Sequence, residues 1–89
     1  MNISTEHLDK LVNVLNVITD SPFTYKPDNF HISSQYSGYS LQRMQLDGGT
    51  LDVLCTGSIS KLGLYRLIEA YIKGIMLMKV NYENEQIQN

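Results

Sequence analysis

The chain has 89 residues and no internal repeat, a length that allows one domain with a small core. Its formal net charge of −2 excludes a broadly basic surface for duplex nucleic acid. Its single cysteine, Cys55, excludes an internal disulfide, and the N-terminus lacks a secretion-signal pattern, so we expect a cytoplasmic protein. Charged residues at helical spacing interrupt the most apolar stretch, 62–80. We therefore predict an amphipathic helix there and no membrane span.

Residues 5–19 are predicted to form the first helix, capped by Ser4 or Thr5 and ended by Pro22, which donates no backbone hydrogen bond. Apolar residues recur at offsets of three and four and define a core-facing stripe: Leu8, Leu11, Val12, Leu15 and Ile18. Polar residues are assigned to the solvent side: Asp9, Lys10, Asn13 and Asn16. Residues 23–29 are expected to be a connection or a short edge strand.

From residue 30 to residue 56 the hydrophobic pattern changes to a period of two, which is typical of strands. Turn residues at Ser37-Gly38 and at 47–49 (Asp-Gly-Gly) divide this region into strands 30–36, 40–46 and 50–56. The expected arrangement is a three-stranded antiparallel meander.

The register of this meander depends on the loop lengths. A two-residue loop within 47–49 would place these residues together on the core face: Met44, Leu46, Leu51, Val53 and Cys55. Ile32 would then sit near Met44 and Phe30 near Leu46, which requires a three-residue connection or a bulge at 37–39. On the opposite face, the same register pairs Arg43 with Asp52 and sets Leu41 against Leu54, with Tyr39 nearby.

The last helix is predicted to begin after Ser60, with Ile59 and Leu64 as a hydrophobic staple. Its apolar stripe comprises Leu64, Leu67, Ile68, Tyr71, Ile72 and Ile75. Gly74 is interpreted as a C-terminal cap or a close helix contact, and residues 75–78 are apolar on every side. We therefore predict one α+β domain over residues 1–80, with both helices on one face of the meander, and a flexible polar tail over 81–89.

Groups that carry chemistry are sparse, and we predict no catalytic residue, no metal site and no cofactor. The parity of Cys55 with Leu51 and Val53 indicates a buried, inert thiol, and no metal-ligand spacing is present. An enzyme that uses Cys55 with His31 is the alternative, and it requires a thiol that solvent can reach.

Apolar residues on the second side of the sheet and late in the last helix suggest a surface for a protein partner or a second copy of the chain. The residues of this possible contact patch are Tyr39, Leu41, Arg43, Leu54, Met76 and Met78. The simpler reading is that they are scattered surface residues or are covered by the tail. An alternative function is single-stranded nucleic-acid binding, with bases stacked on Tyr36 and Tyr39 beside Arg43, but the sparse positive charge disfavours it.

The segment YSGYSLQRMQLDGGTLDVLCTGSISKLGLYRLIEAYIKGI, residues 36–75, resembles a pattern of small uncharacterised accessory proteins of bacterial phages and prophages. An aromatic strand with glycine, a Gly-Gly hairpin and a Ser-Lys helix start carry the resemblance, which covers under half of the chain. It implies an α-β-β-β-α order and an accessory role in a mobile element. It implies no catalytic residue.

Overall fold

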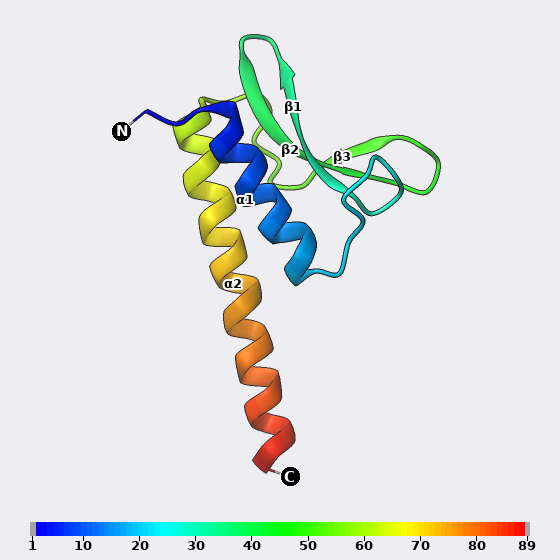
Figure 1. Ribbon diagram of the computed structural model, residues 1–89, viewed down its shortest axis with the longest axis vertical. Coiled ribbons are helices and arrows are strands. Elements are labelled where there is room, and N and C mark those ends of the chain that lie inside the picture. Colours follow the sequence, from blue (N-terminus) through cyan, green and yellow to red (C-terminus); the bar gives the residue numbers. More distant parts are fainter. Residues whose placement is uncertain (1, 89) are drawn as a thin grey trace.

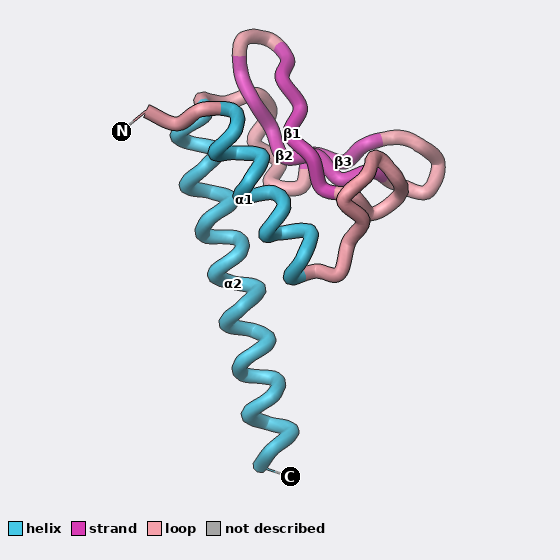
Figure 2. Tube along the Cα trace, in the orientation of Figure 1, coloured by secondary structure: helices cyan, strands magenta, loops and turns pink. Residues whose placement is uncertain are grey.

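The computed structural model describes the backbone of residues 2–88 and the side chains of residues 2–83. The elements in chain order are α1 (Thr5–Ile18), β1 (Phe30–Gln35), β2 (Gly38–Met44), β3 (Thr50–Asp52) and α2 (Lys61–Gln88). The strands form an open antiparallel sheet of order β1-β2-β3, with α1 against β1 and α2 against β2 (Figures 1 and 2). The predicted α+β class, with one helix at each end of the chain and both helices in contact with the sheet, is confirmed.

Helix α1 begins where its capping residues predict. The Ser4 Oγ accepts a hydrogen bond from the His7 N–H at 3.2 Å, and the His7 Nδ1 accepts one from the Ser4 N–H at 3.1 Å. Histidine thus takes the place that glutamate or glutamine usually holds in a capping box. The predicted stripe is confirmed: Leu8, Val12 and Leu15 are buried, and Leu11 and Ile18 are partly buried against the same core.

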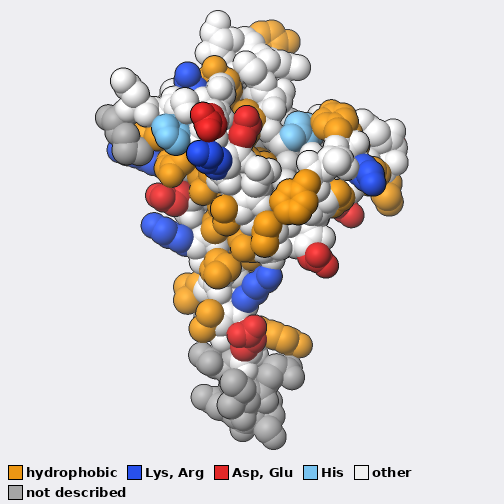
Figure 3. Space-filling model, viewed as in Figure 1, with side chains coloured by type: hydrophobic (Ala, Val, Ile, Leu, Met, Phe, Trp, Pro, Cys, Tyr) orange, Lys and Arg blue, Asp and Glu red, His pale blue; other side chains and the backbone are white. Residues whose placement is uncertain are grey.

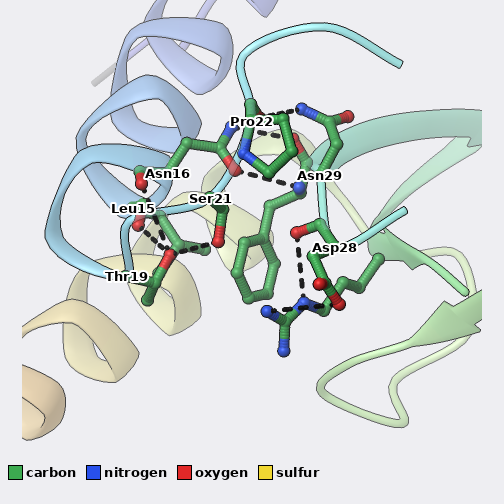
Figure 4. Close-up of polar contacts among 9 residues, drawn as sticks. Leu15, Asn16, Thr19, Ser21, Pro22, Asp28 and Asn29 are labelled. Atoms are coloured by element: carbon green, nitrogen blue, oxygen red, sulfur yellow. Dashed lines mark hydrogen bonds and ion pairs between the residues drawn. The ribbon is translucent and has the colours of Figure 1, made fainter. Parts of the chain in front are cut away.

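The assignment of Asn16 to the solvent side is wrong. Its amide lies in the core, where Nδ2 donates to the Phe30 carbonyl oxygen and Oδ1 accepts from the Phe30 N–H, both at 3.0 Å (Figure 4). Asn16 therefore pairs with the outer edge of β1 as a neighbouring strand would. Close by, the Asn29 Nδ2 donates to the Pro22 carbonyl at 2.6 Å, which fastens the irregular connection between α1 and β1.

The first hairpin has a different register from the predicted one. Its two-residue loop is Tyr36-Ser37, with φ of 54° and 60°, which is the backbone of a type I′ turn. Ile32 lies opposite Leu41 and Phe30 opposite Arg43, not near Met44 and Leu46. The predicted three-residue connection or bulge at 37–39 is therefore wrong.

The second hairpin also departs from the prediction, because residues 45–49 form a five-residue connection instead of a two-residue turn. The Gln45 N–H donates to the Gly49 carbonyl at 2.8 Å, and β3 is only three residues long. Arg43 lies opposite Leu51, and Asp52 lies opposite Gln42. The predicted Arg43–Asp52 pair is thus absent from the register.

These shifts change which side chains enter the core. A displacement of one residue along a strand moves each side chain to the other face of the sheet. Leu41 is fully buried and Met44, which was predicted for the core face, is buried as well, whereas Leu46, Leu51 and Cys55 are exposed. The prediction of a buried thiol at Cys55 is wrong. The core cluster contains Ile3, Leu8, Val12, Leu15, Phe30, Leu41, Leu64 and Ile68.

Helix α2 starts as predicted and then extends much further. The Ser60 Oγ accepts from the Gly63 N–H at 3.1 Å, and Ile59 and Leu64 both pack in the core region. Gly74 lies inside the helix, and no atom is within 4 Å of the place where its Cβ would be, so it is neither a cap nor a close contact within the chain. Residues 81–88, predicted to be a flexible tail, continue the helix, while Asn89 lies outside the described residues.

Candidate interaction surface

The structure separates the residues of the possible contact patch. Leu41 is 0% exposed and belongs to the core, and Tyr39 and Leu54 are partly buried against it. Met76 and Met78 are exposed on α2. The six residues therefore do not form one surface, because the sheet members of the set pack largely inward.

Two of the sheet residues in this set, Arg43 and Tyr39, make contacts with other side chains of the same chain. The Arg43 guanidinium lies over the Phe30 ring, 4.6 Å from its centroid, and its Nε donates to the Asp28 carbonyl at 3.2 Å. One guanidinium nitrogen also lies 3.8 Å from a carboxylate oxygen of Asp28. The Tyr39 ring has the Lys61 ammonium 5.7 Å from its centroid. These contacts hold the two side chains in place on the body of the fold.

The two tyrosines that are predicted to stack bases in the nucleic-acid alternative differ in their surroundings. Tyr36 is 92% exposed at the tip of the first hairpin, while Tyr39 is half-buried beside Lys61. Binding of a single strand through both rings and Arg43 stays a prediction that this arrangement does not favour.

Several exposed large apolar residues follow one another on the distal half of α2, while the others are spread over α1, the loops, the hairpins and the first half of α2. Contacts with the core region end at Ile75, and the Lys79 ammonium then donates to the Ile18 carbonyl at the C-terminal end of α1. A cation at this place interacts favourably with the negative end of the α1 dipole. Figure 1 shows that α2 runs in the same direction as α1 and continues well past its end.

We call the exposed apolar side chains of α2 beyond Ile75 the distal apolar surface: Met76, Leu77, Met78, Val80 and Tyr82. Leu77 and Met78 are 63% and 73% exposed. Figure 3 shows hydrophobic side chains on the viewed face from the lower end of α1 onto the part of α2 below it. On α1, Val14 and Val17 are exposed as well.

The order of residues explains why this surface surrounds the helix. Each residue turns an α-helix by about 100°, so consecutive side chains point in three different directions. Met76, Leu77 and Met78 are consecutive, and α1 lies on only one side of α2. A helix that is apolar on all sides is ordinarily buried among several neighbours. Among the side chains that the structure describes, residues 2–83, those of α2 contact the body of the fold as far as residue 79.

The residues of the enzyme alternative lie apart in the sheet. Cys55 is exposed in the loop after β3, with a φ of 55°, and its Sγ lies 3.7 Å from the Asp52 carbonyl oxygen. His31 is on β1, and β2 lies between β1 and β3. The His31 ring contacts Tyr25, with centroids 4.8 Å apart, and burial lowers the pKa of His31 below its usual 6.5.

The described part of the chain does not offer the other common kinds of site. No pocket is found there, and no three residues of the metal-binding types (His, Cys, Asp, Glu) gather within it. Within residues 2–88, no helix is both long enough and apolar enough to cross a membrane.

Comparison with known proteins gives no further guide to the function. No family model matches the chain, and neither a curated protein nor a solved structure does. The resemblance of residues 36–75 to accessory proteins of phages thus stays a prediction.

Proposed function

We propose that this chain is a small non-enzymatic interaction protein that acts by protein–protein contact through the distal apolar surface. The observation that carries the proposal is that these side chains are exposed on the part of α2 that extends past the end of α1 (Figure 1). Monomeric soluble proteins rarely expose large contiguous apolar patches, and such patches mark interaction sites.

Covering this surface would supply part of the free energy that specific binding requires, and further contacts with the partner would supply the rest. Burial of a large aliphatic side chain contributes roughly 1.5–3 kcal/mol relative to its exposed state. Five side chains that are each half-covered by a partner would together contribute on the order of 5 kcal/mol before the entropic cost of association. Met76 and Met78 are flexible and polarisable, which suits them to contact an apolar partner surface.

The proposal includes an accessory role in a mobile element of phage type. This part rests only on the resemblance of residues 36–75, since no contact in the fold bears on it. A cytoplasmic location is proposed on the single cysteine, which forms no disulfide within the chain.

The test compares two double variants. Leu77→Gln/Met78→Gln makes the distal apolar surface polar, while Leu46→Gln/Leu51→Gln changes two exposed apolar residues on the sheet side of the molecule. Each tagged protein is used to capture partners from its native host, and its mass is measured by sedimentation. We expect the wild type and the sheet variant to associate with a partner or with themselves, and the α2 variant to lose that association.

Two outcomes would overturn the proposal. In one, the wild type captures nothing and sediments as a single chain at about 100 µM, a concentration at which a pair with a dissociation constant of roughly 100 µM or lower is substantially populated. In the other, the α2 variant associates as well as the wild type. Circular dichroism of both variants checks that the fold is retained.

A further inference from the structure

We propose that the distal apolar surface is covered by a second copy of this chain, with the two α2 helices antiparallel about a twofold axis near Gly74. This inference rests on the proposed contact function and names its partner. Helix lengths, exposed positions and the distribution of charge support it, and the area needed for a stable pair requires a second contact beyond α2.

The lengths of the helices match this arrangement. Helix α2 has 28 residues and α1 has 14, so α1 accompanies α2 for about half of its length. Gly74 lies next to the midpoint of α2, and contacts of α2 with the core region end at the following residue, Ile75. An antiparallel pair centred there places the distal half of each helix alongside the body of the partner, and the side of each distal half that carries Leu77 and Met78 is covered at once.

The residues near the proposed axis leave room for a close approach. The exposed positions on this side of α2 follow offsets of three and four: Leu67, Ala70, Gly74, Leu77 and Met78. No atom of the chain lies within 4 Å of the Cβ position at Gly74, so a helix can come near the backbone there. In the antiparallel register Ala70 faces Met78 of the other copy, which sets a small side chain against a large one.

The charges of α2 are divided between its two halves. In the first half, basic residues exceed acidic ones: Lys61, Arg66 and Lys73 against Glu69. In the second half, acidic residues exceed basic ones: Glu83 and Glu85 against Lys79. An antiparallel pair brings the positive half of each helix beside the negative half of the other, and it also opposes the two helix dipoles. A parallel pair would set halves of the same sign together.

The area that two α2 helices can bury against each other is smaller than that of a typical specific interface. A 28-residue helix is about 42 Å long, and a strip about 10 Å wide along it covers about 400 Å² on each copy, or roughly 800 Å² in total. Specific interfaces bury about 1,200 Å² or more. In the antiparallel arrangement the distal half also reaches the partner's α1, where Val14 and Val17 are exposed, and this second contact raises the area toward that value.

The decisive experiment is disulfide trapping in a Cys55→Asn background, which removes the native thiol with a residue that tolerates positive φ. Chains with Leu67→Cys and chains with Asn81→Cys are mixed and oxidised. We expect a crosslink between the two kinds of chain, because these positions face each other when Gly74 is at the axis. Crosslinks of Leu67→Cys to itself would indicate a parallel pair and would overturn the proposal.

A control and a mass measurement complete the test. Gln45→Cys, an exposed position in the second hairpin, reports the background of random collisions, and trapping no higher than this background would overturn the proposal. Sedimentation of the unmodified chain should give twice the chain mass, which Leu77→Gln/Met78→Gln reduces to one. If the wild type is a single chain but still captures another protein in a way that this variant abolishes, the self-pairing is wrong and the contact function stands.

Discussion

Asn16 has only 1% of its surface exposed, and among the described residues it is the polar side chain most fully enclosed by the core. A buried amide is costly unless its donors and acceptors are paired, and both of its groups bond to the backbone of Phe30. The outer edge of β1 faces α1 and not another strand, and the Asn16 side chain supplies the hydrogen-bond partners that a further strand would give to Phe30 there. Sequence periodicity could not find this role, because a polar residue at a helical offset is ordinarily solvated.

Replacement of Asn16 by alanine should lower the free energy of unfolding by about 2–4 kcal/mol. The change leaves the buried N–H and carbonyl of Phe30 without partners, and each unpaired group costs roughly 1–3 kcal/mol. Asn13→Ala is the matched control, since Asn13 is exposed on the same helix, and it should change the stability by less than about 0.5 kcal/mol. Urea unfolding of the two variants measures the difference. Equal stabilities would show that the Asn16–Phe30 pairing contributes little.

His31 should make the stability depend on pH. Burial lowers the pKa of its imidazole in the folded chain below 6.5, so the folded state favours the neutral ring. The contribution is fully present above pH 6.5 and is lost as the pH falls through the lower, folded-state pKa. We expect His31→Gln, which does not titrate, to reduce the loss of stability between about pH 7 and pH 5. His7→Gln keeps a residue suited to the capping box and should leave this part of the pH dependence in place.

At the scale of elements, the helices could be predicted and the sheet register could not. The start of each helix depends on local signals, namely Ser4 or Ser60 as the cap and an apolar stripe behind it, and the structure has both. The register depends on which residues make the turns. Asp47-Gly48 carries the usual hairpin signal, whereas the two-residue turn is made by Tyr36-Ser37, a pair with no such signal. Leu41 was therefore assigned to the surface although it lies in the core.

The first hairpin can be stabilised through its turn. Tyr36 and Ser37 both have positive φ, a conformation that costs a residue with a Cβ roughly 1–2 kcal/mol. Tyr36→Asn/Ser37→Gly supplies the pair that a type I′ turn favours and should raise the free energy of unfolding by about 1 kcal/mol, since the exposed tyrosine ring adds no packing at this place. Ser34→Gly, in the extended backbone of β1, is the control and should destabilise. A double variant less stable than the wild type would contradict the type I′ assignment.

At the scale of the whole molecule, the chain has two parts that meet at about residue 75: the part before it packs around the core, and the part after it is a helix that projects from the fold. The core cluster draws on both helices and the sheet; among the side chains of residues 2–83, its last member is Ile68 and the last one packed against it is Ile75. The sequence predicts more apolar residues at 76–78 than one sheet and one helix can cover, and the structure leaves them exposed. Their continuation in a long helix was not predicted, because Gly74 and the polar composition of 81–89 both indicated an end. Neither signal is strong enough to stop a helix that is already formed.

This division predicts that a chain ending at Val80 folds with nearly the stability of the full chain. It keeps every residue of the core and the contact of Lys79 with the end of α1, so the free energy of unfolding should change by less than about 0.5 kcal/mol. A chain ending at Gly74 is the control: it loses Ile75 and the Lys79 contact and should be less stable by about 1 kcal/mol or more.

Urea unfolding at several protein concentrations separates this effect from association, because a dimer becomes more stable as its concentration rises. We expect the full chain to show that rise and the chain ending at Val80, which lacks Tyr82 and the acidic end of α2, to show less of it. If the chain ending at Val80 were strongly destabilised even at the lowest concentration, residues 81–88 would have to support the body of the fold, and the distal half of α2 would then belong to the domain and not to its contact surface.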